Sequence, residues 1–331
     1  MHYFARSGGM QGFEALVREL GGDPLALVRA AGLPAGLFTH PDLYVDYLAL
    51  ARLTTLAAER CQAPDFGVRL GLRQGLEVLG PLASFLCLQA TIGDALQLLV
   101  RHMDFHAHGV VLTTRVEGDD VVFRLGFAFE RETACAQLGA LSVLQILQGL
   151  RQVQPAPLPP RGLTLCLRMD ETLLRRHAGL DGPVTTGAPC NSLRFPVELL
   201  GRPVAVSEAL RARLMQQWRV EDGDSGLASQ VGRVITALLP TGECSLQQVA
   251  AMIGLHPRTL QQRLKQEQQC YGGLLRDIRY ALACQYLDRT DMGVTTLALN
   301  LGYEDVAVFS RAFRGWTGQS PRDWRQSRRD G

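Results

Sequence analysis

A run of polar side chains in the last third of the chain has the types and spacing that read DNA. The four residues stand at i, i+3, i+4 and i+7 and therefore share one face of a helix; they are Arg258, Gln261, Gln262 and Lys265. Arginine pairs bidentately with guanine, glutamine pairs with adenine, and lysine reaches guanine or a phosphate. Many helix faces are polar only because they face solvent. On this pattern alone, an ordinary solvent-exposed face is therefore the alternative to a DNA-reading face.

The elements around this face predict a helix-turn-helix. Ser245 and Gln248 form a capping box, and an apolar stripe with helical spacing follows, at Leu246, Val249, Ala250 and Ile253. Gly254 ends this helix and Pro257 opens the next, whose buried side is expected to hold Leu260 and Leu264. Two short helices around a tight turn that contains glycine form the motif that places its second helix in the major groove.

A second unit of the same kind follows about fifty residues later. Gly302 makes its turn, Asp305 caps its second helix, and that helix is anchored by Phe309, Phe313 and Trp316. Its outward face is expected to carry Ala307, Ser310, Arg311 and Arg314. A longer helix over residues 274–287 separates the two units. At a separation of about 34 Å the units would enter successive major grooves from one side.

Residues 245–325 resemble the double helix-turn-helix domain of the AraC/XylS family of bacterial transcription regulators. The matching positions are Val249, Ala250, Gly254, Leu255, residues 257–264, Arg279, Ala283, Tyr286, Leu287, Gly302, Tyr303, residues 309–313, residues 316–321, Trp324 and Arg325. The resemblance implies double-stranded promoter DNA as a partner, together with RNA polymerase.

Three positions depart from the family pattern. His256 stands where the family has a serine or a similar cap, so the first reading helix is expected to begin less firmly, at a cost of about 1 kcal/mol. Gln268 and Gln269 replace a turn that contains glycine. Ala307 replaces a serine, which predicts weaker or more apolar reading by the second unit. For Arg279 and Arg325 the sequence allows two roles, a contact with a DNA phosphate or a contact with a partner inside the domain.

The preceding two-thirds predict an α+β domain joined to this all-α domain. The first ninety residues have the periodicity of helices, residues 109–116 and 120–129 form a predicted hairpin, and residues 132–153 form a helix. Strands are expected over 162–168 and 193–195, and Ser207 caps a helix that runs to Trp218. The acidic, glycine-containing segment 219–226 is the predicted linker between a domain of residues 1–218 and a DNA-binding domain of residues 227–331.

The N-terminal domain resembles the effector-sensing domain of the AraC-type branch that includes regulators of ornithine use. The resemblance rests on residues 22–24, 40–42, 66–67, 79–82, 91–95, 191–195 and 202–203. It implies a homodimer and a small effector that is fatty-acid-like or derived from an amino acid, with no assignment of pocket residues.

Composition limits the other function classes. The 331 residues are 47% hydrophobic and 20% charged, as expected for two folded domains without a membrane span or a signal peptide, and a cytoplasmic protein is expected. Residues 226–331 hold thirteen Arg and Lys against nine Asp and Glu, which suits a polyanionic partner.

The remaining alternatives depend on the N-terminal domain. A metal cluster of His102, Asp104, His106 and His108 is the less favoured interpretation, since no distant ligand completes it, and neither a metal nor a cofactor is expected. The chain is expected not to be an enzyme, because no paired catalytic groups are found. The alternatives are an enzyme in the N-terminal domain that is targeted to DNA by the helical module, and a structural DNA binder without an effector.

Overall fold

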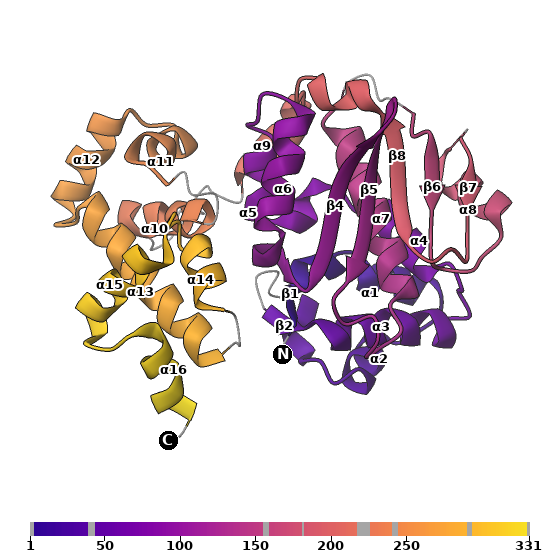
Figure 1. Cartoon of the computed structure of the whole chain (residues 1–331), viewed down its shortest axis with the longest axis horizontal. Helices are drawn as coiled ribbons and strands as arrows, with labels where there is room; N and C mark the ends of the chain where they lie inside the picture. The colour runs from indigo at the N-terminus through magenta and orange to yellow at the C-terminus, as the bar shows by residue number, and fades with distance from the viewer. Residues whose placement is uncertain are drawn as a thin grey trace. The chain divides into compact units, whose positions relative to one another are not determined.

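The computed structural model describes residues 3–38, 44–154, 159–180, 182–216, 226–239, 244–289 and 293–329 (Figure 1). The chain divides into two compact units, Tyr3–Arg211 and Ala212–Gly331. The first unit combines helices with two sheets and the second is helical, which confirms the predicted fold class. Apart from Gly226, the segment 219–226 lies outside the described residues, so the linker stays a prediction.

Helices are the main regular elements of the first unit, and side-chain caps fix where several of them begin. Asp23 accepts hydrogen bonds from the backbone of Leu25 and Ala26, and Thr91 and Asp94 cap each other's backbone, as their spacing predicts. The helices are α1 (Phe13–Glu19), α2 (Pro24–Ala30), α3 (Tyr47–Arg60), α4 (Phe66–Leu72), α5 (Pro81–Leu86), α6 (Ile92–His106), α7 (Ala136–Gln152), α8 (Glu171–Ala178) and α9 (Glu208–Gln216), with 3-10 turns η1 (Ser7–Met10), η2 (Ala35–Phe38), η3 (Leu76–Leu79) and η4 (Val197–Gly201).

The larger sheet has five strands in the order β4-β5-β8-β6-β7. They are β4 (Val110–Glu117), β5 (Asp120–Phe127), β6 (Gly162–Thr164), β7 (Val184–Thr185) and β8 (Asn191–Pro196). The predicted hairpin is confirmed, with Val110 paired to Phe127 and Glu117 paired to Asp120. All neighbours are antiparallel except β6 and β7.

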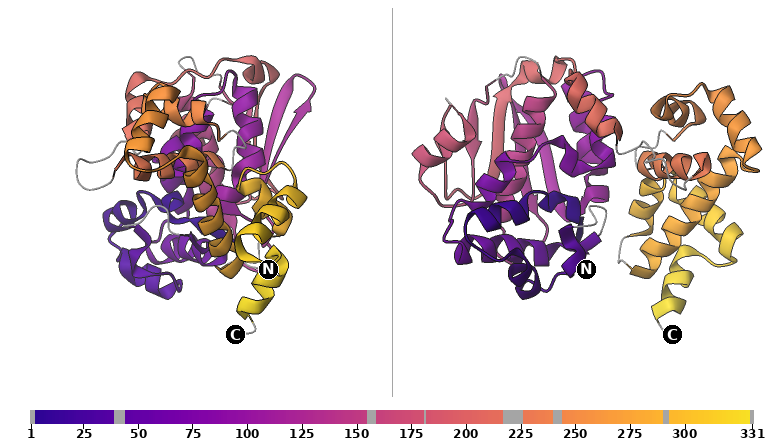
Figure 2. Two further views of the ribbon diagram at one scale, coloured as in Figure 1. Left: turned by 90° about the vertical axis from the view of Figure 1, so that its left-hand side faces the viewer. Right: turned by 180° about the vertical axis from the view of Figure 1, so that it is seen from behind.

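Helix α7 covers one face of this sheet (Figures 1 and 2) and also packs closely on α4. Gly67 and Gly71, one turn apart on α4, make the close approach possible. A Cβ atom on Gly67 would lie 2.1 Å from the Gln137 carbonyl oxygen, and one on Gly71 would lie 2.6 Å from the Leu141 oxygen. The Gln137 side chain also accepts a hydrogen bond from the Gly67 nitrogen at 2.8 Å, so α7 is held firmly as a wall of the unit's core.

The structure differs from the prediction in three places in this unit. A small sheet of β1 (Phe4–Arg6), β2 (Tyr44–Asp46) and β3 (Ala107–His108) adds two strands to the predicted helical region, because three-residue strands are too short to show alternation. The helix predicted from residue 132 begins at Ala136, after a turn in which Glu132 donates to Phe129. The strand predicted over 162–168 ends at Thr164, since the Asn191 side chain takes the Cys166 N–H.

The second unit contains the two predicted helix-turn-helix units, α11–α12 and α14–α15, separated by the long helix α13. Val249, Leu260 and Leu264 are buried in the first, and Leu297, Phe309 and Phe313 in the second. The helices are α10 (Leu227–Leu238), α11 (Leu246–Ile253), α12 (Pro257–Gln266), α13 (Tyr271–Arg289), α14 (Val294–Asn300), α15 (Val306–Thr317) and α16 (Pro321–Arg329). No helix in the described ranges is both long and apolar enough to cross a membrane.

Candidate functional site

Helix α12 is fixed at its start by a turn with strong local constraints. Ser245 and Gln248 form the predicted capping box of α11, and Gly254 ends that helix with a φ of 74°, which favours glycine. His256 then accepts a hydrogen bond from the Arg258 nitrogen through Nδ1 at 3.3 Å. His256 therefore occupies the predicted cap position with an imidazole nitrogen in place of a serine oxygen, and the less firm start of the helix stays a prediction.

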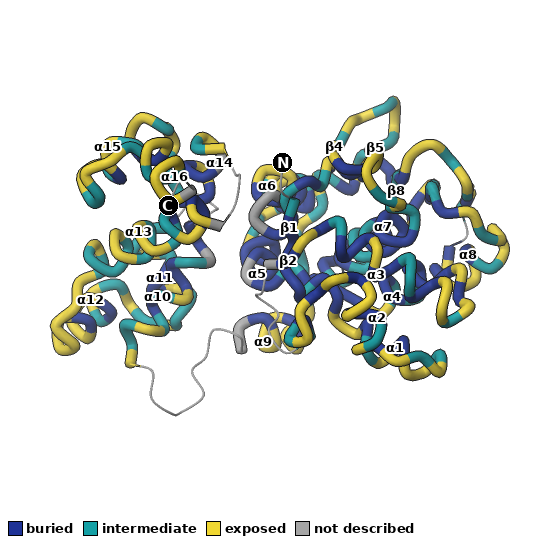
Figure 3. The backbone as a smooth tube through the Cα atoms, turned by 90° about the horizontal axis from the view of Figure 1, so that it is seen from below, coloured by how far each residue is buried: buried dark blue, intermediate teal, exposed yellow. Residues whose placement is uncertain are grey.

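The two faces of α12 have opposite surroundings. Leu260 and Leu264 are fully buried, whereas all four predicted reading residues are exposed: Arg258, Gln261, Gln262 and Lys265. Figure 3 shows the exposed and buried positions along this helix. Beyond its end, Gln268 adopts a φ of 58° in the turn where the family has glycine. The polar face is thus free for a partner and contributes little to the core.

Helix α15 has the same division but different residue types. Asp305 caps it, accepting a hydrogen bond from the Ala307 nitrogen at 2.6 Å, and Phe309 and Phe313 are fully buried. Ala307, Arg311 and Arg314 are exposed, while Ser310 is half-buried and donates its hydroxyl to the Val306 carbonyl at 2.8 Å. The outward face of α15 therefore offers two arginines, one methyl group and a hydroxyl that can still accept.

Two arginines for which the sequence allowed either a phosphate contact or an internal partner make contacts inside the domain. Arg279 donates to the carbonyl oxygens of Leu301 at 2.9 Å and Gly302 at 3.1 Å, and its guanidinium lies 4.4 Å from the centre of the Tyr303 ring. Arg325 donates to the Leu287 carbonyl at 3.3 Å. These contacts tie α13 to the second turn and to α16.

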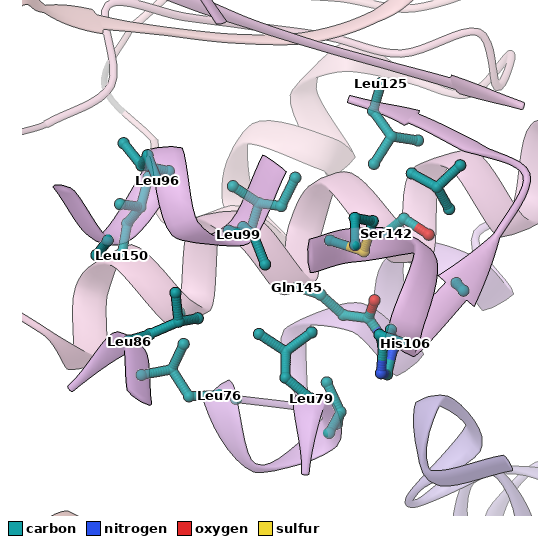
Figure 4. Close-up of a pocket in the computed structure, with 18 of the residues that line it drawn as sticks. Leu76, Leu79, Leu86, Leu96, Leu99, His106, Leu125, Ser142, Gln145 and Leu150 are labelled. Atoms are coloured by element: carbon teal, nitrogen blue, oxygen red, sulfur yellow. The ribbon is translucent and has the colours of Figure 1, made fainter. Parts of the chain in front are cut away.

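A pocket lies in the first unit, where apolar faces of α6 and α7 meet η3 (Figure 4). It encloses about 810 Å³ of space that atoms do not fill, including its open mouth. The wall that α6 contributes is a continuous helical stripe of Ile92, Ala95, Leu96, Leu99, Met103 and His106. The opposite wall consists of Ser142, Gln145, Ile146, Gly149 and Leu150 from α7, with Val153 directly after the helix.

The polar groups of the pocket gather at one end. Figure 4 shows Ser142, Gln145 and His106 on the same side, with Leu86, Leu96 and Leu150 toward the other. Burial, together with the positive charge of Arg6, lowers the pKa of His106 to about 3, so its imidazole is neutral near pH 7.

Tyr47 adds a hydroxyl to the pocket wall. Burial raises the pKa of Tyr47 far above its ordinary value, and a hydrogen bond from Ser142 offsets only part of that rise. The titratable groups of the pocket wall are thus neutral near pH 7.

The histidines considered as metal ligands do not form a metal site within the described residues. His102 and His106 are both buried on α6, and His108 lies on β3. Burial, with a smaller effect from Arg101, lowers the pKa of His102 to about 4.

Sequence reasoning did not find the pocket, because its apolar stripes have the same periodicity as any core-facing helix. The available signal was on α7, where Ser142 and Gln145 interrupt an otherwise apolar face one turn apart. Polar groups on a core-facing helix cost free energy unless they find hydrogen-bond partners or line a cavity.

Comparison with known proteins identifies a family for each of the two regions that hold the candidate sites. Residues 21–204 match the family described as "Arabinose-binding domain of AraC transcription regulator, N-term", and residues 249–327 match a helix-turn-helix domain family. The chain belongs to the AraC family of transcription regulators. It is accordingly a DNA-binding regulator with a ligand-binding N-terminal domain.

Relatives align along almost the whole chain. The regulator VirS of Mycobacterium tuberculosis is 27% identical over 97% of this chain and 96% of its own length. The ornithine utilization regulator of Pseudomonas aeruginosa is 28% identical over 94% of this chain and 93% of its own. The crystal structure of the transcriptional regulator CdpR from Pseudomonas aeruginosa is 23% identical, with a TM-score of 0.41, and covers 92% of this chain and 96% of that chain.

Proposed function

We propose that this AraC-family member recognises specific promoter sequences by placing α12 and α15 in successive major grooves. The observation that carries the proposal is that each helix is the second of a helix-turn-helix, buries one face in the core and leaves its other face to solvent. The contacting residues are Arg258, Gln261, Gln262 and Lys265 on α12, and Ala307, Ser310, Arg311 and Arg314 on α15.

The two helices contribute different chemistry to this recognition. On α12, Arg258 and the two glutamines supply the bidentate hydrogen bonds that distinguish guanine and adenine. On α15, the methyl group of Ala307 suits apolar contact with thymine, while Arg311 and Arg314 reach either bases or phosphates. Hydrogen-bonded sequence discrimination therefore comes mainly from α12.

The sensing part of the proposal places the effector in the pocket between α6 and α7. Its support is that this pocket lies within the residues that match the arabinose-binding domain family. An effector that binds one conformation of the domain more tightly shifts the population toward that conformation, and so changes DNA binding or activation. The family also favours a homodimer that contacts RNA polymerase.

Selection of sheared genomic DNA by the purified protein at physiological salt tests the DNA-reading part. The expected result is enrichment of a site with two boxes about 10 bp apart, one for each reading helix. A matched selection with a double variant, Gln261→Ala and Gln262→Ala, is expected to lose preference within one box only. Retention of random fragments, with or without cell extract as an effector source, would contradict sequence-specific reading, because electrostatic binding alone carries no sequence preference.

A further inference from the structure

The wall of the pocket between α6 and α7 is apolar and uncharged. Among the described residues that line it there is no Asp, Glu, Lys or Arg, and polar atoms come from Tyr47, His106, Ser142 and Gln145. An ionised ligand group that enters such a site loses its hydration without gaining an opposite charge from the wall. The positive charge of Arg6, which lowers the pKa of His106, lies outside this wall, and the Arg6 guanidinium donates a hydrogen bond to the Leu79 carbonyl at 3.1 Å.

The hydrogen bonds around Gln145 determine which amide atom it can offer. Gln74 donates from Nε2 to the carbonyls of Gly9 at 3.0 Å and Gln11 at 2.7 Å, so its Oε1 must be an acceptor. Gln145 donates hydrogen bonds from its own Nε2 to that Gln74 oxygen and to the Gly9 carbonyl. Within the described part of the chain, Gln145 Oε1 receives no hydrogen bond, and it is the amide atom left for a ligand.

His106 supplies, at the same end, a second polar atom that lacks a partner in the described ranges. Its side chain is 8% exposed, and its Nδ1 is buried with no hydrogen-bond partner among the described residues. A buried polar atom without a partner is costly and rare in folded proteins. A ligand that hydrogen-bonds both Gln145 and His106 would remove that cost.

We propose that the pocket binds an uncharged, mostly aliphatic molecule that carries a hydroxyl group, with the hydroxyl at Gln145 and His106 and the chain along the leucines of α6. A hydroxyl donates one hydrogen bond and accepts others, so it satisfies the acceptor on Gln145 and also the imidazole. A ketone only accepts hydrogen bonds and therefore leaves the Gln145 acceptor unsatisfied. A carboxylate brings one charge that the pocket wall does not pair, and a free amino acid brings two such charges. The inference rests on the proposed function, since it concerns the effector of the same domain.

Calorimetric titration of the full chain at pH 7.5 tests this assignment with four probes: 1-octanol, 2-octanone, octanoate and L-ornithine. We expect 1-octanol to bind at least about tenfold more tightly than octanoate, with no heat of binding from L-ornithine. The Gln145→Met variant is expected to weaken 1-octanol binding by about threefold to tenfold, the range for one hydrogen bond, and to change 2-octanone binding by less than about twofold.

Two tryptophan substitutions locate the binding. Ile146→Trp fills the pocket and is expected to abolish 1-octanol binding, whereas Leu88→Trp, at a position that is 55% exposed and outside the pocket wall, leaves it unchanged. Thermal unfolding without ligand shows whether each variant is folded, and the comparison of probes on the unmodified chain needs no variant.

Several results would overturn the assignment. Octanoate binding as tightly as 1-octanol, with loss of that binding in Arg6→Gln, would show a site for an anion. Equal 1-octanol binding by both tryptophan variants would place the ligand elsewhere, and no binding by any probe would remove this ligand class. Since no DNA is present, each outcome is independent of the test of promoter recognition.

Discussion

The two pairs of helices that carry the candidate sites use their faces in opposite ways. Helices α12 and α15 bury their apolar faces in the core and leave the candidate residues in solvent, apart from the half-buried Ser310, whereas α6 and α7 turn apolar faces toward a shared pocket. The proposed reading residues are therefore expected to add little to stability, while the buried pocket residues belong to the core itself. Substitutions on the outward faces of α12 and α15 are therefore expected to leave the fold intact, whereas substitutions in the pocket wall are expected to lower stability together with any ligand binding there.

Leu99→Ala in α6 gives the largest expected effect. Leu99 is buried and lines the pocket, and truncation of a buried leucine costs about 2–5 kcal/mol of unfolding free energy. Urea denaturation measures the loss, with Gln261→Ala on α12 as the exposed counterpart, expected within about 0.5 kcal/mol of the unmodified chain. Equal losses in the two variants would remove the distinction between the two kinds of face.

Acid is expected to destabilise the sensing unit through the buried histidines. Because burial lowers the pKa of His106 from 6.5 to about 3, the unfolded chain takes up a proton first as the pH falls. Stability from this group is complete above pH 6.5 and is lost progressively toward pH 3, with roughly 2 kcal/mol lost at pH 5.

Urea unfolding at pH 7.5, 6 and 5 measures this loss, with His106→Gln as the matched variant. The variant is expected to show a shallower pH dependence, while His102, whose pKa is lowered to about 4, keeps part of the slope. Identical slopes for the two proteins would show that His106 does not resist protonation in the folded state.

Ser245→Ala tests whether caps, rather than outward side chains, stabilise the helix-turn-helix. Ser245 accepts a hydrogen bond from the Gln248 nitrogen at 3.2 Å, and loss of such a cap costs about 1 kcal/mol. The measurement is the urea midpoint of the second unit, followed by tryptophan fluorescence, with Gln262→Ala as a control that leaves the midpoint unchanged. A larger loss in the control than in Ser245→Ala would contradict the expectation.

Arg311→Ala has the smallest expected effect and compares the two reading helices. If Arg311 on α15 contacts a phosphate, its loss weakens selected and random DNA alike and lowers the slope of log affinity against log salt by about 1. Titration of fluorescent duplexes at several salt concentrations gives this slope. A loss confined to the selected site would instead make α15 a base reader equal to α12.

The second unit was largely predictable from its sequence because each of its constraints is local. Ser245, Gly254 and Asp305 mark helix ends, and the apolar stripes lie within a few turns of them. The cap position of His256 was also visible in the sequence, but the contact of its Nδ1 with the backbone was not, because imidazole is an uncommon cap.

The pocket was not predictable because it depends on contacts between distant segments. The role proposed for Gln145 depends on Gln74 and Gly9, far away in sequence, which hold its nitrogen. Likewise, the short strand β3 pairs with β1 across about a hundred residues, and β1 pairs with β2 across about forty. Neither relation leaves a periodic pattern in the chain.

The most direct test of the central claim compares two arginines on one helix. Arg258 and Arg263 are both exposed on α12, but only Arg258 shares the face of Gln261, Gln262 and Lys265. Affinities of Arg258→Ala and Arg263→Ala are measured on a selected site and on random duplex DNA at one salt concentration. The account predicts that Arg258→Ala loses about 1–3 kcal/mol on the selected site alone and relaxes one base position, while Arg263→Ala leaves the ratio of the two affinities unchanged. Equal losses for Arg258→Ala on both duplexes would contradict base reading by this face.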